Sequence, residues 1–121
     1  MYNLKYKIWL DNNGVIFGAG PYTLLKGVKE KGSLAGAAKA MNMSYNKAHN
    51  LIKKIETRLG FQLLDSKPGG AGGGISQLTA EAESLMSVYE QFYNECKESL
   101  DKIFEKYFSD QSPLPGKHKT G

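Results

Sequence analysis

Apolar residues recur at helical spacing in two neighbouring segments that a short turn separates. The first segment follows Gly32-Ser33, and one of its faces collects Leu34, Ala37, Ala38 and Met41. The second follows Asn42-Met43-Ser44, and one of its faces collects Ala48, Leu51, Ile52, Ile55 and Leu59. A serine stands before each segment, where its hydroxyl can cap the first helical turn. Two amphipathic helices joined in this way predict a helix-turn-helix.

The opposite face of the second predicted helix is basic and rich in amides, and it carries no carboxylate. It consists of Asn46, Lys47, His49, Asn50, Lys53, Lys54 and Thr57. A helix with such a face can enter the major groove of DNA, because asparagine reads adenine edges and lysine reaches guanine or phosphate. This face predicts that the protein binds DNA.

The chain before the helix-turn-helix is predicted to form a β-hairpin and one helix. Apolar and polar residues alternate over residues 4–10, which predicts a half-buried strand. Asp11-Asn12-Asn13-Gly14 is a strong turn sequence, and residues 15–17 are expected to return as the second strand. A helix from Pro21 to about Lys31 is expected to bury Leu24, Leu25 and Val28.

Two short apolar segments after the helix-turn-helix predict a two-stranded ribbon. The strands are expected at residues 61–64 and 75–78, and the glycine-rich residues 67–74 between them cannot form regular structure. A helix-turn-helix followed by such a ribbon is a winged helix. The fold class is therefore mainly α with a small β component.

A single long helix is predicted from the cap Thr79 to about Phe108. At a rise of ~1.5 Å per residue it is about 45 Å long, more than one small domain can cover. We therefore expect a homodimer that pairs along an apolar stripe of Leu85, Tyr89, Phe92, Cys96, Leu100, Ile103 and Tyr107. The predicted organisation is a winged helix with its hairpin at residues 1–78, the dimerisation helix at 79–108 and a disordered tail at 109–121.

Composition supports an intracellular protein whose basic half carries the helix-turn-helix. The chain has 121 residues, of which 40% are hydrophobic, enough for one modest core. Residues 1–60 have a net charge of +7 and residues 61–121 a net charge of −3, so the basic half is where phosphate would be neutralised. One cysteine excludes an intramolecular disulfide. Without a membrane-spanning run or a signal-peptide pattern, a cytoplasmic location is expected.

The glycine-rich segment is open to two interpretations. Ile75-Ser76 follows it where a P-loop needs lysine and a hydroxyl residue, so a nucleotide site is disfavoured. The segment is either a wing tip that lies along the DNA backbone or a plain flexible loop. The residues of the wing tip would be Lys67, Gly69, Gly70, Gly72, Gly73 and Gly74.

No set of residues in the sequence resembles a catalytic or metal site. His49 has no neighbouring carboxylate or cysteine to make a ligand set or a general base, so it either contacts DNA or is an ordinary exposed residue. We expect no enzyme, no cofactor and no metal. The competing function is a winged helix that docks another regulator instead of DNA.

The arrangement resembles the N-terminal winged-helix domain of LysR-type bacterial regulators, and within them the molybdate-responsive ModE-type branch. The resemblance covers about residues 5–108 and depends most on GSLAGAAKAMNMSYNKAHNLIKKIE, LGFQLL and GGAGGGISQLTAE. It implies DNA contacts from Ser44, Tyr45, Asn46, Lys47, His49, Asn50 and Lys53.

Two residues depart from the ModE-type pattern, which usually has Trp at His49 and Gly at Ala82. ModE-type proteins also carry C-terminal molybdate-binding modules, and LysR-type proteins carry an effector domain. The chain ends soon after the long helix, so we expect a stand-alone prokaryotic regulator with a pseudo-palindromic operator. We expect no tight molybdate binding by this chain alone.

Overall fold

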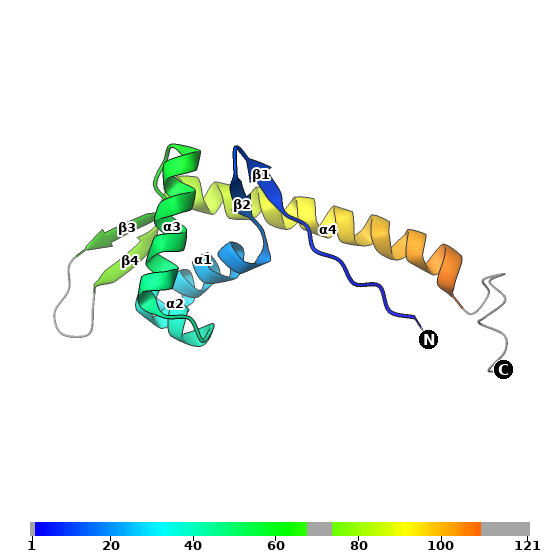
Figure 1. The fold of residues 1–121 in the computed structure, drawn as a ribbon, viewed down its shortest axis with the longest axis horizontal. Helices are drawn as coiled ribbons and strands as arrows, with labels where there is room; N and C mark the ends of the chain where they lie inside the picture. Colours follow the sequence, from blue (N-terminus) through cyan, green and yellow to red (C-terminus); the bar gives the residue numbers. More distant parts are fainter. Residues whose placement is uncertain (1, 68–73, 110–121) are drawn as a thin grey trace. The chain divides into compact units, whose positions relative to one another are not determined.

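The structure is a computed structural model that describes residues 2–67 and 74–109 (Figure 1). Two compact units divide the chain: Ile8–Ser87 form one, and the N-terminal residues up to Lys7 together with the chain from Val88 onward form the other. In chain order the elements are β1 (Leu10–Asn12), β2 (Val15–Phe17), α1 (Ala19–Lys31), α2 (Leu34–Ala40), α3 (Tyr45–Leu59), β3 (Leu64–Lys67), β4 (Ile75–Leu78) and α4 (Ala80–Phe108). The predicted fold class, a mainly α winged helix-turn-helix, is confirmed.

The N-terminal hairpin is present, but its first strand is shorter than predicted. β1 pairs with β2 in antiparallel register, with Leu10 opposite Phe17. Asn13 and Gly14 both have positive φ angles, 52° and 91°, as a two-residue hairpin turn requires. The strand predicted over residues 4–10 was wrong, because the chain enters α1 directly after Phe17 and leaves residues 4–9 without a strand to pair with.

Helix α1 buries Leu24, Leu25 and Val28, as predicted. It begins at Ala19 rather than at Pro21, and Gly18 is its N-cap. Proline is tolerated at the third helical position because the N–H it lacks would have no partner within the first turn. α1 and α2 approach closely, since a Cβ on Gly27 would lie only 2.9 Å from the Cβ of Ala37.

The helix-turn-helix forms where the spacing predicts it, and both serine caps are confirmed. The Oγ of Ser33 accepts a hydrogen bond from the Gly36 N–H at 3.0 Å, and that of Ser44 accepts one from the Lys47 N–H at 3.1 Å. Asn42 turns the chain between α2 and α3 with a φ of 55°. Gly60, with a φ of 83°, ends α3.

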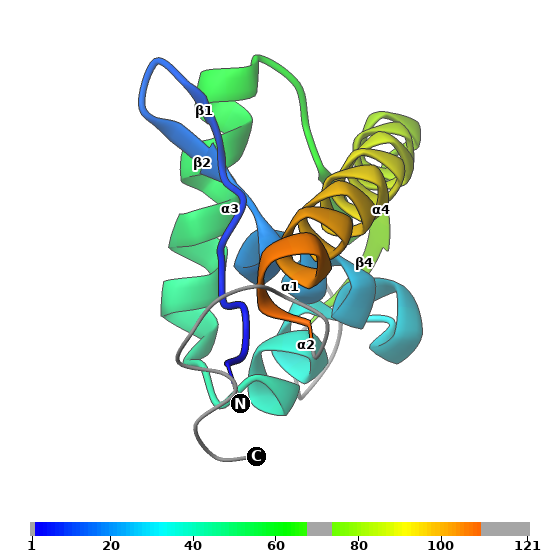
Figure 2. The same ribbon diagram turned by 90° about the vertical axis from the view of Figure 1, so that its right-hand side faces the viewer.

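The hairpin lies against the C-terminal part of α3 (Figure 2). A guanidinium nitrogen of Arg58 donates a hydrogen bond to the carbonyl of Asn13 in the hairpin turn. Gly14 has a φ of 91°, a conformation that L side chains rarely adopt, so a larger residue in this turn would be strained.

The ribbon β3–β4 is the wing, and its first strand begins later than predicted. The strands pair in antiparallel register from Leu64 opposite Leu78 to Lys67 opposite Ile75. The strand predicted at residues 61–64 was wrong by three positions. Two contacts with other segments explain this difference: the Leu63 N–H donates to the Glu56 carboxylate at 2.7 Å, and the Leu63 carbonyl accepts from the Thr79 N–H at 3.0 Å. Both backbone groups are therefore used before the strand starts.

Helix α4 extends to Phe108 as predicted, and Thr79 caps it by accepting a hydrogen bond from the Ala82 N–H at 3.1 Å. In the unit that holds the first turns of α4, Ala82 is fully buried and Lys29 of α1 pairs with Glu83 at 3.1 Å.

In the unit that contains residues 88–109, two aromatic contacts join the N-terminal segment to α4. The ring centroids of Tyr2 and Phe108 are 5.1 Å apart, and those of Tyr6 and Tyr93 are 6.5 Å apart. Burial, and to a smaller extent Tyr93, raises the pKa of Tyr89. A hydrogen bond to Asp101 at 2.8 Å raises the pKa of Lys97.

Candidate nucleic-acid interface

Helix α3 presents one polar face to solvent. Its opposite face is fixed in the core by Ala48, Ile52 and Ile55, which are all buried. This packing orients the exposed face, which consists of Asn46, Lys47, Asn50, Lys53, Lys54 and Thr57. The structure thus brings together the basic and amide side chains that the sequence placed on one face.

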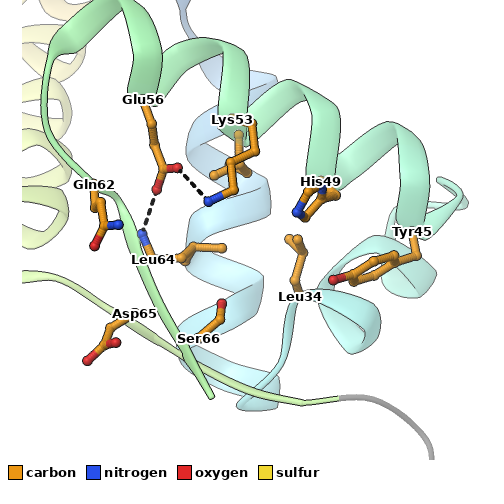
Figure 3. A pocket seen from close by; sticks show the side chains of 10 residues that line it. Leu34, Tyr45, His49, Lys53, Glu56, Gln62, Leu64, Asp65 and Ser66 are labelled. Atoms are coloured by element: carbon orange, nitrogen blue, oxygen red, sulfur yellow. Dashed lines mark hydrogen bonds and ion pairs between the residues drawn. The ribbon is translucent and has the colours of Figure 1, made fainter. Parts of the chain in front are cut away.

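Tyr45 and His49 lie on the side of α3 that faces the wing (Figure 3). Their rings stack with centroids 5.8 Å apart, and Tyr45 is 51% exposed. Together with Gln62, Asp65 and Ser66 they line a hollow of about 210 Å³ between α3 and β3. His49 is half-buried and not exposed as expected, but Tyr45, which stacks on it at the start of α3, can pack on a nucleic-acid backbone or base.

Glu56 is a residue of this site that the sequence analysis did not single out. It lies on α3 and is only 8% exposed. One carboxylate oxygen accepts hydrogen bonds from the N–H groups of Leu63 at 2.7 Å and Leu64 at 3.1 Å, and the other lies 3.4 Å from the Lys53 ammonium (Figure 3). In the sequence, its burial is indicated by the helical period, which places Glu56 beside Ile52 and Ile55 on the buried side of α3.

The wing is tied to the helices through its second strand. The Ser76 N–H donates to the carbonyl of Gly32 at 3.1 Å, and the hydroxyls of Ser66 and Ser76 lie 3.1 Å apart. Lys67 and Gly74, at the two ends of the tip, are exposed. The other predicted tip residues lie outside the described residues: Gly69, Gly70, Gly72 and Gly73.

The predicted dimer residues on α4 differ in how far the chain itself covers them. Tyr89 is buried, and Leu85, Cys96 and Leu100 are half-buried. Phe92, Ile103 and Tyr107 are exposed, and so is Val88, which the sequence analysis did not include. Tyr93 was missed as the contact of Tyr6, because nothing in the helical period shows which segment packs on it.

Within residues 2–67 and 74–109, no three His, Cys, Asp or Glu side chains are grouped to hold a metal ion. The helices of the same residues include none with the length and apolar character to cross a membrane.

These features define a helix-turn-helix protein with a wing, and comparison with known proteins places it in a family. Residues 22–83 match the family described as "Bacterial regulatory helix-turn-helix protein, lysR family". The chain therefore belongs to the lysR family of bacterial regulatory helix-turn-helix proteins. This membership confirms the prediction of a regulator rather than an enzyme.

Two relatives have names that refer to molybdenum or to regulation. The transcriptional regulator ModE of Yersinia pestis is 34% identical over 91 residues, which are 75% of this chain and 33% of the relative. The molybdenum-pterin-binding protein MopB of Rhodobacter capsulatus is 30% identical over 80 residues, which are 66% of this chain and 30% of the relative. The chain thus spans about a third of the length of these relatives.

Solved structures support the fold. A crystal structure of the CbnR DNA-binding domain with DNA matches with a TM-score of 0.53 at 23% identity, over 69% of this chain and 91% of that chain. Full-length CbnR with its target DNA matches with a TM-score of 0.56 at 22% identity, over 73% of this chain and 29% of that chain.

Proposed function

We propose that this chain is a sequence-specific DNA-binding regulator of transcription that inserts α3 into the major groove. The observation that carries the proposal is the face of α3, where three lysines and two asparagines are exposed while Ile52 and Ile55 anchor the helix. Membership of the lysR family of regulators supports it. A regulator of transcription in a bacterium acts on the chromosome, so we propose a cytoplasmic location.

The side chains of α3 divide into base-reading and backbone-binding groups. Asn46 and Asn50 can each bond an adenine edge with both amide atoms, which is the contact that selects sequence. Lys47 and Lys54 carry charge to phosphate or guanine, and no ion pair holds either of them within the described residues. Lys53 differs from these two, because its ammonium lies 3.4 Å from the Glu56 carboxylate.

Three further contacts with the DNA backbone complete the proposed interface. Ser44, the exposed cap of α3, and the stacked pair Tyr45 and His49 stand at the helix start, where phosphates pass in this mode of binding. The wing, with Lys67 and the glycines that follow it, would lie on the flanking backbone. The phosphate contacts set register and affinity, while the asparagines set sequence.

We propose a homodimer that pairs through α4. The exposed side chains of Phe92, Ile103 and Tyr107 support it. Burial of each against a second protomer would stabilise the dimer by on the order of 1.5–3 kcal/mol. A two-fold dimer presents two copies of α3, so the operator should be a pseudo-palindrome with half-sites about one helical turn, or a multiple of it, apart.

We also propose that this chain binds no molybdate tightly by itself. The hollow beside α3 is lined by two carboxylates, Glu56 and Asp65, and its lysine, Lys53, is already paired with Glu56. Such a lining repels an oxyanion. Calorimetry should detect no stoichiometric binding of molybdate at micromolar concentrations, and a tight one-to-one isotherm would contradict this proposal.

Retention on immobilised random duplex at low salt tests the proposed function against the competing one. A DNA-binding protein should be retained and should elute as salt rises, because phosphate contacts release counterions. A module that docks another protein should pass through the column. A triple variant with Lys47, Lys53 and Lys54 changed to Gln is the matched control and should elute much earlier than the wild type.

A further inference from the structure

Glu56 is a buried, charged residue on the helix that we propose for DNA binding, and its side chain does not belong to the exposed face of that helix. A carboxylate that is only 8% exposed must have partners for its charge, since burial without them is costly. Its partners are two backbone N–H groups of the segment that leads into the wing, and the ammonium of Lys53.

The two backbone contacts fix the direction of this carboxylate. One oxygen receives the N–H groups of Leu63 and Leu64 at 2.7 and 3.1 Å. The Leu63 carbonyl is held in turn by the Thr79 N–H at 3.0 Å, so the segment that orients Glu56 is itself immobilised. With one oxygen fixed in this way, the second oxygen faces Lys53 at 3.4 Å.

Lys53 therefore differs from the other lysines of the same face, because a carboxylate lies beside its ammonium. Its side chain is 57% exposed, so it could reach a phosphate, but its ammonium lies beside a carboxylate that cannot turn away. A phosphate that approaches Lys53 must compete with Glu56 for the ammonium and also meets the negative charge of Glu56. Within the described residues, no such partner stands beside Lys47 or Lys54.

We propose that Glu56 is a positioning residue that holds Lys53 back from phosphate and so lowers the affinity for DNA of any sequence. The inference rests on the proposed function of α3. Contacts with phosphate do not depend on sequence, whereas the asparagine contacts do. By weakening one phosphate contact beside the base-reading side chains, Glu56 lowers specific and non-specific affinity together and leaves the selection of sequence to the asparagines.

The decisive variant is Glu56→Gln, because glutamine has the same shape and keeps one oxygen for the N–H groups of Leu63 and Leu64. Its amide NH₂ replaces the oxygen that faces Lys53, so the ammonium is released. Affinity for a random duplex is measured at several salt concentrations. The slope of log affinity against log salt should become steeper by about 0.9, the value for one additional phosphate contact.

Two controls separate the release of Lys53 from a general change of charge. Glu30→Gln changes the net charge by the same amount at an exposed position of α1, and it should leave the slope close to that of the wild type. Lys53→Gln combined with Glu56→Gln should remove the added steepness. If Glu56→Gln and Glu30→Gln have the same slope, the proposal is overturned.

A second comparison needs only exposed substitutions and does not depend on the folding of Glu56→Gln. Lys53→Gln should lower the slope clearly less than Lys54→Gln does when Glu56 is present, and an equal reduction by the two variants would contradict the proposal. A wild-type protein that binds no duplex at low salt would overturn the proposed function itself. Binding by the wild type with equal effects of Lys53→Gln and Lys54→Gln would overturn only the role of Glu56.

Discussion

Helices α3 and α4 are both amphipathic, but they leave opposite kinds of surface exposed. In α3 the chain buries the centre of the apolar side, with Ile52 and Ile55 each 2% exposed, and the polar side faces solvent. In α4 beyond Ser87, apolar side chains such as Phe92 and Ile103 remain in solvent. An exposed basic face suits a hydrated, charged ligand, whereas an exposed apolar stripe suits a second protein surface. This difference supports the proposals that α3 binds DNA and that α4 binds a second protomer.

The largest loss of stability is expected when a buried side chain of α3 is truncated. Ile52→Ala should lower the free energy of unfolding by about 2–5 kcal/mol at every protein concentration, because it leaves a cavity in the core of one chain. Ile103→Ala on α4 should lower stability only as far as the dimer contributes, so its effect should grow with protein concentration. Thermal unfolding at several concentrations measures both. If the loss of stability in Ile103→Ala is independent of protein concentration, Ile103 is not buried by a second protomer, and the contrast between α3 and α4 does not hold.

Charge on the stripe of α4 should separate the protomers. Leu100→Glu places an unpaired carboxylate in the proposed seam, so the protein should remain helical but become largely monomeric and bind its operator much more weakly. Asn94→Glu adds the same charge at an exposed, polar position of α4 and should keep the wild-type mass. Light scattering and circular dichroism give mass and helicity. The same mass for the wild type and Leu100→Glu would exclude α4 as the interface.

On the polar face of α3, the substitution of an asparagine and the substitution of a lysine should weaken DNA binding in different ways. Asn50→Ala should cost ~1–3 kcal/mol at one base position and relax the preference there. Lys54→Ala should weaken binding to all duplexes alike and reduce the salt slope by about one unit. Affinities for duplexes with single base changes, measured at two salt concentrations, separate the two effects. Identical profiles for both variants would argue against base reading by Asn50.

The smallest effect is expected at the cap of α3. Ser44→Ala removes the acceptor for the Lys47 N–H and should destabilise the protein by about 0.5–2 kcal/mol. Ser44→Gly should cost only a few tenths of a kcal/mol, because glycine exposes the same N–H group to water. Urea unfolding of the two variants makes the comparison. Equal stability of the alanine variant and the wild type would mean that the cap does not hold the start of α3.

The sequence predicted the features that depend on near neighbours. The stripe of Ile52 and Ile55, the caps Ser33 and Ser44, and the extent of α4 all follow from residues within one or two turns. These features determine which face of α3 is exposed, so most of the candidate site was predictable.

The errors concern pairing between distant segments. Alternation in residues 4–10 could not show that β2 is too short to pair with them, and the wing begins at Leu64 because Glu56 and Thr79 bind the peptide of Leu63 first. The burial of Glu56 was missed for the same reason: the two backbone N–H groups that bind its carboxylate lie seven and eight positions further along the chain. The proposed partner of α4 lies outside the chain, and no pattern within one chain identifies it.

A competition measurement shows whether the exposed face of α3 reads DNA sequence. Duplexes are selected by the protein from a random pool, and the best of them is compared with a scrambled duplex of the same length and base composition at physiological salt. The selected duplex should bind at least about 10³-fold more tightly than the scrambled one, as specific sites do, and Asn50→Ala should reduce this ratio of affinities. Equal affinity of the wild-type protein for the two duplexes would contradict the reading of sequence by α3.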